Sequence, residues 1–329
     1  MEKLNKYNTV ILLGPTAAGK TSLGVSLALK YGWDIISADS RQVYCGLDLG
    51  SGKDIDEYSG VVKNADGSER PFKIPYHLID ETTLDSEFNV YNFQSAFYQL
   101  FNDFESKGKM PFVVGGTGMY IDSICREYNF VEVPENAGLR KELEEKSLEE
   151  LDEILLKIKP DLHNKSDLLL RDRTIRAIEI ALFMQDEERV KCEKEKINIP
   201  KVTPFVLGTN IPRDELLKNI RIRLEERFSL GMTEEVMALH QSGYSWERLE
   251  KLGLEYRYIS EYLEGKKTFS VMKEELYHAI CQFSKRQVTW FRGMERKGVK
   301  INWLPQVNDK EARLNAAIKL IDENVMGSF

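Results

Sequence analysis

The chain has 329 residues, of which 42% are hydrophobic and 30% are charged, and its net charge at pH 7 is −7. This composition is typical of a globular protein with one or two domains, and the acidic balance excludes a polycation, so a nucleic-acid surface would have to be a local basic patch. The four cysteines form no Cys-x-x-Cys pair and no apolar run approaches the length of a membrane span, which argues against a zinc module, a disulfide framework and a membrane anchor and favours a cytoplasmic location.

The first predicted strand, residues 10–13, leads into a loop with glycine at both ends and then into a predicted helix that starts at Thr21. Both glycines permit backbone angles at which successive N–H groups point at phosphate oxygens, beside the positive end of the helix. Lys20 adds a charge, and the Thr21 hydroxyl can hold Mg²⁺. The pattern predicts a site for a diphosphate or polyphosphate, and the alternative is a glycine-rich turn that binds nothing. The residues of this phosphate-binding loop are Gly14, Pro15, Thr16, Ala17, Ala18, Gly19, Lys20 and Thr21.

Two further predicted strands end in residues that suit a ligand site. Residues 34–40 predict a second parallel strand, which places Asp39 at the carboxyl edge of the sheet, where open α/β sheets bind ligands. Residues 110–114 predict another strand, which opens into a second glycine-rich loop that contains Thr117. An aspartate in the position of Asp39 can also cap the following helix, and sequence position alone does not separate the two roles.

The composition changes between residues 122 and 200, where helices are predicted over 139–158 and 171–184. We expect these residues to form an all-helical insertion domain in a catalytic core made of residues 1–121 and 201–329. The core is predicted to be an α/β, P-loop NTPase-like parallel sheet flanked by helices.

Three other segments complete the core. Residues 54–74 are polar and rich in turn residues, and they predict a surface hairpin or an excursion from the sheet. A strand over residues 202–210 is expected to rejoin the sheet. A long amphipathic helix or helix pair, broken near Gly231, is predicted over residues 213–240.

Basic residues on two predicted helices have two possible roles each. Arg171, Arg173 and Arg176 make part of one face of the helix 171–184 basic, either as a solvated surface or as a phosphate contact. Arg223 and Arg227 share a flank of the later helix, where ion pairs with neighbouring glutamates are the alternative to a ligand.

The segment Lys285–Arg292 interleaves basic and aromatic side chains. That mixture suits contact with an RNA backbone and stacking on its bases. Trp290 and Phe291 could equally belong to the core.

Several blocks of the sequence together resemble the tRNA dimethylallyltransferase family, also called tRNA isopentenyltransferases, of the bacterial type. The blocks keep the order of the family and extend over nearly the whole chain, and the second and the last are more specific than the phosphate-binding loop, which many families share. The blocks are Gly14–Thr21, Ser37–Tyr44, Gly46–Gly50, Pro75–Asp80, Gly115–Tyr120, Arg173–Glu179 and Lys285–Arg292.

The resemblance implies a Mg²⁺-dependent transfer of the dimethylallyl group of dimethylallyl diphosphate to N6 of the adenosine that follows the anticodon in tRNA. A leaving diphosphate needs preorganised donors and a metal ion, for which Lys20, Thr21 and Arg223 are suited. The exocyclic amine needs a base, and Asp39 matches the carboxylate that serves the family in this role. The expected partners are therefore the anticodon stem-loop of tRNA and dimethylallyl diphosphate, and we expect a monomer.

The resemblance also implies a set of tRNA contacts along the chain. Glu255 departs from the family pattern, because many members have glycine there, so this contact is the least secure. The implied tRNA-contacting residues are Asp39, Ser40, Arg41, Gln42, Thr117, Arg140, Asp172, Arg173, Thr174, Ile175, Arg176, Gly253, Leu254, Glu255, Tyr256, Arg257 and Tyr258.

Two other functions remain open at the level of sequence. An adenylate isopentenyltransferase would prenylate free AMP, ADP or ATP, and the basic helical insertion and the Lys285–Arg292 segment favour tRNA over it. A P-loop nucleotide kinase or NTP-binding module is the other alternative. Against it, we find no apolar strand that ends in the Asp expected of a Walker-B magnesium site.

Overall fold

The computed structural model describes residues 6–63, 67–160, 168, 170–195 and 199–328. The chain divides into two compact units, Met1–Glu127 with Pro200–Phe329, and Tyr128–Ile199. The sequence placed the first boundary near residue 122. The structure places it later, because α3 (Gly118–Cys125) continues past that point and buries Ile121 and Ile124 in the first unit.

The first unit is built on a six-stranded sheet in the order β5-β2-β6-β1-β7-β8, in which every neighbouring pair is parallel. The central strands read as continuous apolar runs because helices cover both faces of a parallel sheet. This confirms the predicted fold class. The strands are β1 (Thr9–Leu13), β2 (Ile35–Ala38), β5 (Tyr76–His77), β6 (Phe112–Gly115), β7 (Pro204–Gly208) and β8 (Ile301–Trp303).

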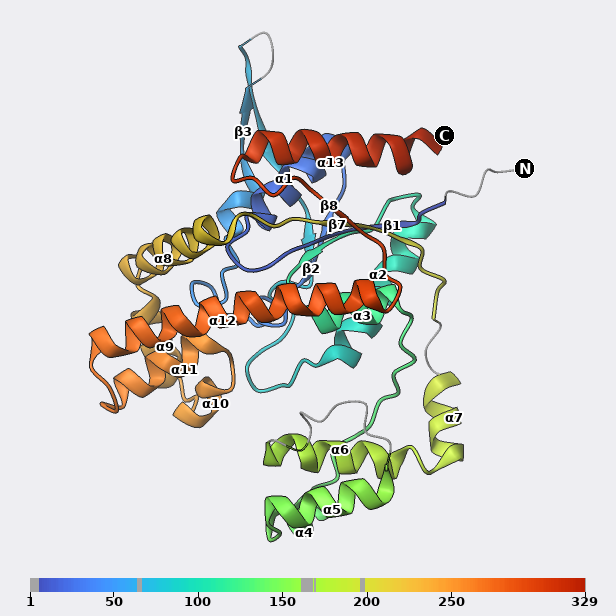
Figure 1. Cartoon of the computed structure of the whole chain (residues 1–329), viewed down its shortest axis with the longest axis vertical. Coiled ribbons are helices and arrows are strands. Elements are labelled where there is room, and N and C mark those ends of the chain that lie inside the picture. Colours follow the sequence, from blue (N-terminus) through green and yellow to red (C-terminus); the bar gives the residue numbers. More distant parts are fainter. Residues whose placement is uncertain (1–5, 64–66, 161–167, 169, 196–198, 329) are drawn as a thin grey trace. The chain divides into compact units, whose positions relative to one another are not determined.

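Helices pack on both faces of the sheet (Figure 1). One face, which carries Val10 and Leu12, is covered by α1 (Lys20–Tyr31) and α13 (Lys310–Asn324), and their apolar residues share one buried cluster. On the opposite face lie α2 (Val90–Ser106), α3 and α12 (Phe269–Arg296).

A second buried cluster joins α12 to the helices that follow β7 in the chain. The predicted break near Gly231 is confirmed: this glycine has φ 99° and separates two helices. The helices are α8 (Arg213–Ser229), α9 (Met232–Gln241), α10 (Trp246–Glu250) and α11 (Leu254–Leu263), and the chain ends with the short helix η3 (Met326–Ser328).

The excursion expected over residues 54–74 is an antiparallel hairpin preceded by a short helix. Strands β3 (Ser59–Lys63) and β4 (Glu69–Lys73) pair only with each other among the described residues, and η1 (Ile55–Tyr58) precedes them. The helix η1 matters for function because it begins directly after Asp54, which has φ 46°.

The second unit is helical wherever the structure describes it, around a small core of Leu143, Leu151, Leu155 and Ile178. The prediction of a single helix over residues 139–158 is wrong. The chain turns at residues 145–147, and Ser147 caps a new helix in a capping box with Glu150. The helices are α4 (Ala137–Glu144), α5 (Leu148–Ile158), α6 (Arg171–Phe183) and α7 (Glu187–Glu195).

Along the described part of the chain, no helix combines the length and the apolar character that crossing a bilayer requires.

Candidate active site

Three loops meet at the carboxyl edge of the sheet, because β1 pairs with β6 and β6 pairs with β2. The phosphate-binding loop follows β1, the Asp39 loop follows β2, and the second glycine loop follows β6. Two hydrogen bonds hold the last two together: Thr117 N donates to Ala38 O at 3.1 Å, and Ser40 N donates to Thr117 Oγ1 at 3.1 Å. The topology thus brings Asp39 and Thr117 to the loop that was predicted to bind phosphate.

The phosphate-binding loop has the backbone that its sequence predicts. Gly19 precedes α1 with φ 75°, a conformation that a side chain disfavours. Lys20 Nζ turns back over the loop and donates to Pro15 O at 2.8 Å. The buried guanidinium of Arg313, on α13, donates to Ala18 O in the same loop at 2.5 Å, a contact that no local pattern in the sequence predicts.

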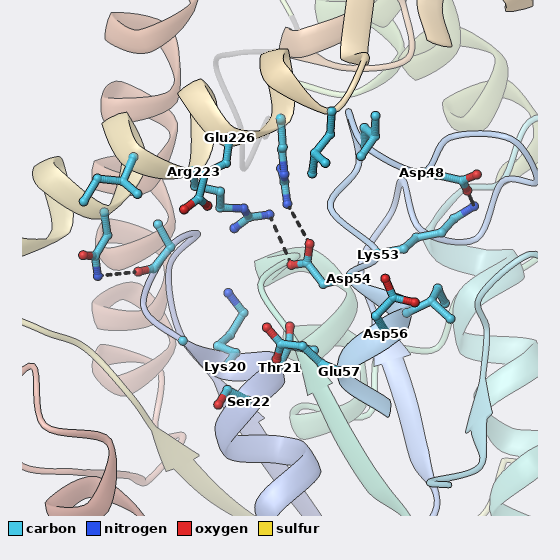
Figure 2. Close-up of a pocket in the computed structure, with 18 of the residues that line it drawn as sticks. Lys20, Thr21, Ser22, Asp48, Lys53, Asp54, Asp56, Glu57, Arg223 and Glu226 are labelled. Carbon is cyan, nitrogen blue, oxygen red and sulfur yellow. Dashed lines mark hydrogen bonds and ion pairs between the residues drawn. The ribbon is translucent and has the colours of Figure 1, made fainter. Parts of the chain in front are cut away.

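A cavity of about 700 Å³ opens beside this loop. Lys20 and Thr21 line one side, Arg223 and Arg227 on α8 line another, and Asp54 lies between the two groups. Figure 2 shows the Arg223 side chain reaching from α8 toward the Asp54 carboxylate, with Lys20 and Thr21 at the start of α1. The size suits a small polyphosphate ligand, and the cations suit its charge.

The cations in this cavity are half-buried or buried and repel one another. Burial, followed by repulsion from Arg223, lowers the pKa of Lys20 to about 8, although Asp39 and Asp54 oppose the shift. Burial, followed by repulsion from Arg227, lowers the pKa of Arg223 to about 10. Such a cluster is costly without an anion, so the site is set up to bind negative charge.

Asp54 supplies that negative charge in the structure, although no pattern in the sequence predicts it. Its Oδ1 accepts a hydrogen bond from Arg227 at 3.3 Å, and its Oδ2 lies 4.0 Å from Arg223. The neighbouring Lys53 is 1% exposed and donates to Asp48 at 2.7 Å and to Asp80. These ion pairs hold the segment that carries Asp54 against the cavity.

The carboxylate of Asp39 accepts a hydrogen bond from Arg41 N at 2.9 Å. Residues 40–47 form turns and an isolated bridge, so the alternative role of capping a following helix is wrong. The charge of Asp39 acts on both Lys20 and Arg223, for which it raises the pKa against the stronger effects that lower it. Asp39 therefore lies within electrostatic reach of the phosphate-binding groups.

The oxygen donors of the cavity fit a magnesium ion only in company with a ligand. Among the described residues, no three His, Cys, Asp or Glu side chains are grouped closely enough to hold a metal by themselves. The Thr21 hydroxyl and the carboxylates of Asp54, Asp56 and Glu57 line the same cavity. Mg²⁺ is commonly held by one or two protein oxygens together with phosphate oxygens and water, and this donor set is compatible with that mode.

Several side chains implied to contact tRNA in the first unit have other partners. Tyr256 is 1% exposed and donates to Glu235 Oε1 at 2.7 Å. The prediction that its side chain contacts RNA is therefore wrong. Gln42 is held by Ser37 Oγ and donates to Gly52 O at 2.9 Å.

Glu255, the residue that departs from the family pattern, points inward. It lines a small cavity with Arg223, Arg227 and Thr16, and burial raises the pKa of its carboxyl. The half-buried Glu255 therefore belongs to the charge network of the site. Of its neighbours, Arg257 is exposed, Leu254 and Tyr258 are half-buried, and Gly253 precedes α11 with φ 145°.

The second unit also separates structural residues from exposed ones. Thr174 is 0% exposed and Ile175 is buried. The prediction that these two side chains contact RNA is therefore wrong. Arg140 and Arg176 both donate to the buried carboxylate of Glu179, at 2.9 and 3.0 Å. Of the residues in this unit that were implied to contact tRNA, Asp172 and Arg173 are exposed.

The segment Lys285–Arg292 combines both roles that its composition allowed. Lys285, Arg286 and Trp290 are exposed on α12, whereas Phe291 is fully buried. The Gln287 side chain, for which the sequence predicted no separate role within this block, is buried against Thr16 and Gly116.

The chain is similar to known proteins over nearly its whole length. The family model described as IPP transferase matches residues 42–294, and the model described as Isopentenyl transferase matches residues 7–63. The chain is 48% identical over 301 residues to "tRNA dimethylallyltransferase 2" of Treponema denticola, covering 91% of this chain and 96% of the relative. It is 49% identical over 305 residues to "tRNA dimethylallyltransferase 1" of Syntrophus aciditrophicus, covering 93% and 95%.

Solved structures show the same fold. The full-length tRNA isopentenylpyrophosphate transferase of Bacillus halodurans matches with a TM-score of 0.66 and 26% identity, over 98% of this chain and 97% of that one. A eukaryotic dimethylallyltransferase solved in the course of acting on tRNA matches with a TM-score of 0.69 and 21% identity, over 98% and 77%, which speaks for the fold alone. The chain therefore belongs to the tRNA dimethylallyltransferase family and is a prenyltransferase.

Proposed function

We propose that this enzyme transfers the dimethylallyl group of dimethylallyl diphosphate to N6 of the adenosine directly 3′ of the anticodon in tRNA, and releases diphosphate. The observation that carries the proposal is the meeting of the phosphate-binding loop with the Asp39 loop at one edge of the sheet, where Asp39 acts electrostatically on Lys20. A site for the leaving group after β1 and a base after β2 would thereby come from the two strands that flank β6.

In the reaction, the bond between C1 of the dimethylallyl group and the diphosphate oxygen breaks, and a bond from N6 of adenosine to C1 forms. The charge that develops on the diphosphate is stabilised by Lys20, Arg223 and the loop N–H groups. The proton that N6 loses passes to the Asp39 carboxylate. Since Asp39 already accepts from Arg41 N, its orientation is fixed before the substrate binds.

The Thr21 hydroxyl, with Asp54 and Glu57 as further oxygen donors, is proposed to hold Mg²⁺ against the diphosphate. When bound, the ion neutralises charge on the leaving group. The low pKa of Lys20 supports an arrangement in which diphosphate, not a protein carboxylate, provides the main counter-charge.

The RNA substrate is proposed to be the anticodon stem-loop, whose target base leaves its stack to reach the Asp39 loop. Exposed basic residues support contact with the RNA backbone at Arg173 on the second unit and at Lys285 and Arg286 on α12. We further propose that the enzyme acts as a monomer in the cytoplasm, where its RNA substrate is found.

The test is a product assay with the full-length chain, dimethylallyl diphosphate, Mg²⁺ and an anticodon stem-loop, read by mass spectrometry of digested RNA. We expect one added dimethylallyl group on the target adenosine and none on a stem-loop with guanosine in that position. AMP added in excess as a competing acceptor should remain unmodified. Prenylated AMP with unmodified RNA would instead establish the free-nucleotide activity.

A further inference from the structure

The buried amide of Gln287 connects two loops of the site. Gln287 lies on α12 and is 8% exposed. Its Oε1 accepts a hydrogen bond of 2.8 Å from Thr16 N in the phosphate-binding loop, and its Nε2 donates one of 2.9 Å to Gly116 O in the second glycine loop. The two loops are thus cross-linked by one side chain that is 271 residues from the first and 171 from the second in sequence.

The second glycine loop is shaped to receive α12. A Cβ placed on Gly116 would lie 2.6 Å from Gln287 Nε2, and one placed on Gly118 would collide with the Trp290 ring. Side chains at either position would therefore push the loop and the helix apart. The absence of a side chain at Gly116 is what allows the amide to reach the carbonyl oxygen.

The connection continues from Gly116 to the base. The next residue, Thr117, donates through its N–H to Ala38 O and accepts through Oγ1 from Ser40 N, each at 3.1 Å. Ala38 and Ser40 are the two neighbours of Asp39 in the chain. An unbroken series of hydrogen bonds and peptide units therefore runs from Thr16, through Gln287 and Thr117, to the residues that flank Asp39.

The amide of Gln287 satisfies both partners, which an ionised carboxylate or an apolar side chain cannot do. Thr16 N–H requires an acceptor, and the Gly116 carbonyl requires a donor. A carboxylate of the same shape offers an acceptor to both and would face the Gly116 oxygen with a like partial charge. An apolar side chain offers neither partner, although it fills a similar volume.

We propose that Gln287 is a positioning residue that fixes the distance between the phosphate-binding loop and the Asp39 loop, and so aligns the leaving diphosphate with the attacking amine. This role rests on the proposed function. It gives Gln287 a part in the chemical step without contact to either substrate. The exposed RNA-facing residues of α12 then serve binding, while the buried one serves alignment.

The test compares three variants of the full chain. Gln287→Glu keeps the shape and loses the donor, and Gln287→Met keeps most of the volume and loses both hydrogen bonds without adding charge. Gln282→Glu makes the same charge change at an exposed position on the same helix and is the matched control. Steady-state prenyl transfer to a stem-loop gives kcat and both KM values, and titration with inorganic diphosphate reports on the phosphate-binding loop alone.

We expect kcat to fall by about 100-fold in both Gln287 variants, as misalignment of about 1 Å can cause, while KM for the RNA stays within about threefold of wild type. Gln282→Glu should behave as wild type. The proposal is overturned if either folded Gln287 variant keeps kcat within twofold of wild type, or if its loss lies wholly in KM for the RNA.

Failure of the proposed function would look different from failure of this inference. If the wild-type chain prenylates no RNA, the function fails, and the diphosphate titration still tests the link to Thr16. In that titration, Gln287→Met should bind inorganic diphosphate several-fold more weakly than Gln282→Glu, because the loop loses a fixed contact. Equal affinity of these two variants for inorganic diphosphate would show that the hydrogen bond from Thr16 N to Gln287 does not order the phosphate-binding loop.

Discussion

Asp54 accepts a hydrogen bond from Arg227 at 3.3 Å, and both residues line the cavity beside the phosphate-binding loop. Arg223 lies 4.0 Å from the other oxygen of the same carboxylate. Asp54 therefore occupies a position among cations that the diphosphate would share. The backbone of Asp54 is left-handed, with φ 46°, and Lys53 beside it is buried between two carboxylates, so the placement is held firmly.

Asp54→Asn should strengthen the binding of inorganic diphosphate, because it removes a negative charge that competes for Arg223 and Arg227. We expect the affinity to rise by about tenfold, or ~1.4 kcal/mol, in a calorimetric titration with EDTA present so that metal binding does not enter. Asp56→Asn removes one carboxylate from the same cavity and leaves the Asp54 pairs intact, and it should change the affinity less. Unchanged or weaker binding in Asp54→Asn would show that the carboxylate supports the arginines instead of competing for them.

The affinity for diphosphate should fall as the pH rises through about 8. Burial and the nearby Arg223 lower the pKa of Lys20 to about 8, so Lys20 is charged below this pH and neutral above it in the free enzyme. Because the charged form binds the anion, each pH unit above 8 should weaken binding by up to about tenfold relative to a charged reference.

The reference for this titration is Lys20→Arg, which stays charged over the whole range. Calorimetry between pH 6.5 and 9.5 with both proteins removes the titration of the ligand itself from the comparison. The affinity of the wild type divided by that of Lys20→Arg should be constant below pH 7 and should fall above pH 8. A ratio that is flat across the range would mean that Lys20 does not lose its proton in the accessible range.

Arg173→Ala should weaken the binding of tRNA without affecting the fold of the second unit. Arg173 is exposed on α6, whereas Arg140 and Arg176 are engaged by Glu179. Loss of one phosphate contact should lower the affinity by about three- to tenfold at low salt and reduce the slope of log K against log salt by about 1. Arg189→Ala, an exposed arginine on α7 of the same unit, is the control. Equal affinities and slopes for the two variants would remove Arg173 from the RNA surface.

The parallel core and its loops could be predicted from the sequence because their signals are local. Buried strands such as residues 10–13 are short apolar runs, and the glycines and Lys20 follow one of them at fixed spacing. The position of Asp39 then follows from the rule that parallel strands share a carboxyl edge. The break at Gly231 is likewise a local signal, since its backbone requires positive φ.

The remaining parts of the site depend on contacts between distant residues. Asp54 and Arg227 are 173 positions apart, and Gln287 and Thr16 are 271 apart, so no local pattern relates them. Resemblance to a family was least reliable for side chains that alternate between inside and outside within one helical turn. Tyr256 and Thr174 lie in blocks that resemble RNA-contacting segments, yet each faces a core.

The central claim is that the Asp39 carboxylate removes the proton from the attacking amine while the phosphate-binding loop holds the leaving group. The most direct measurement is single-turnover prenyl transfer by Asp39→Asn, which retains the oxygen that accepts from Arg41 N and removes the charge. With saturating dimethylallyl diphosphate and stem-loop, we predict a rate at least about 100-fold below wild type and an RNA dissociation constant within about twofold. A variant that transfers the dimethylallyl group at a rate near that of wild type would contradict the account.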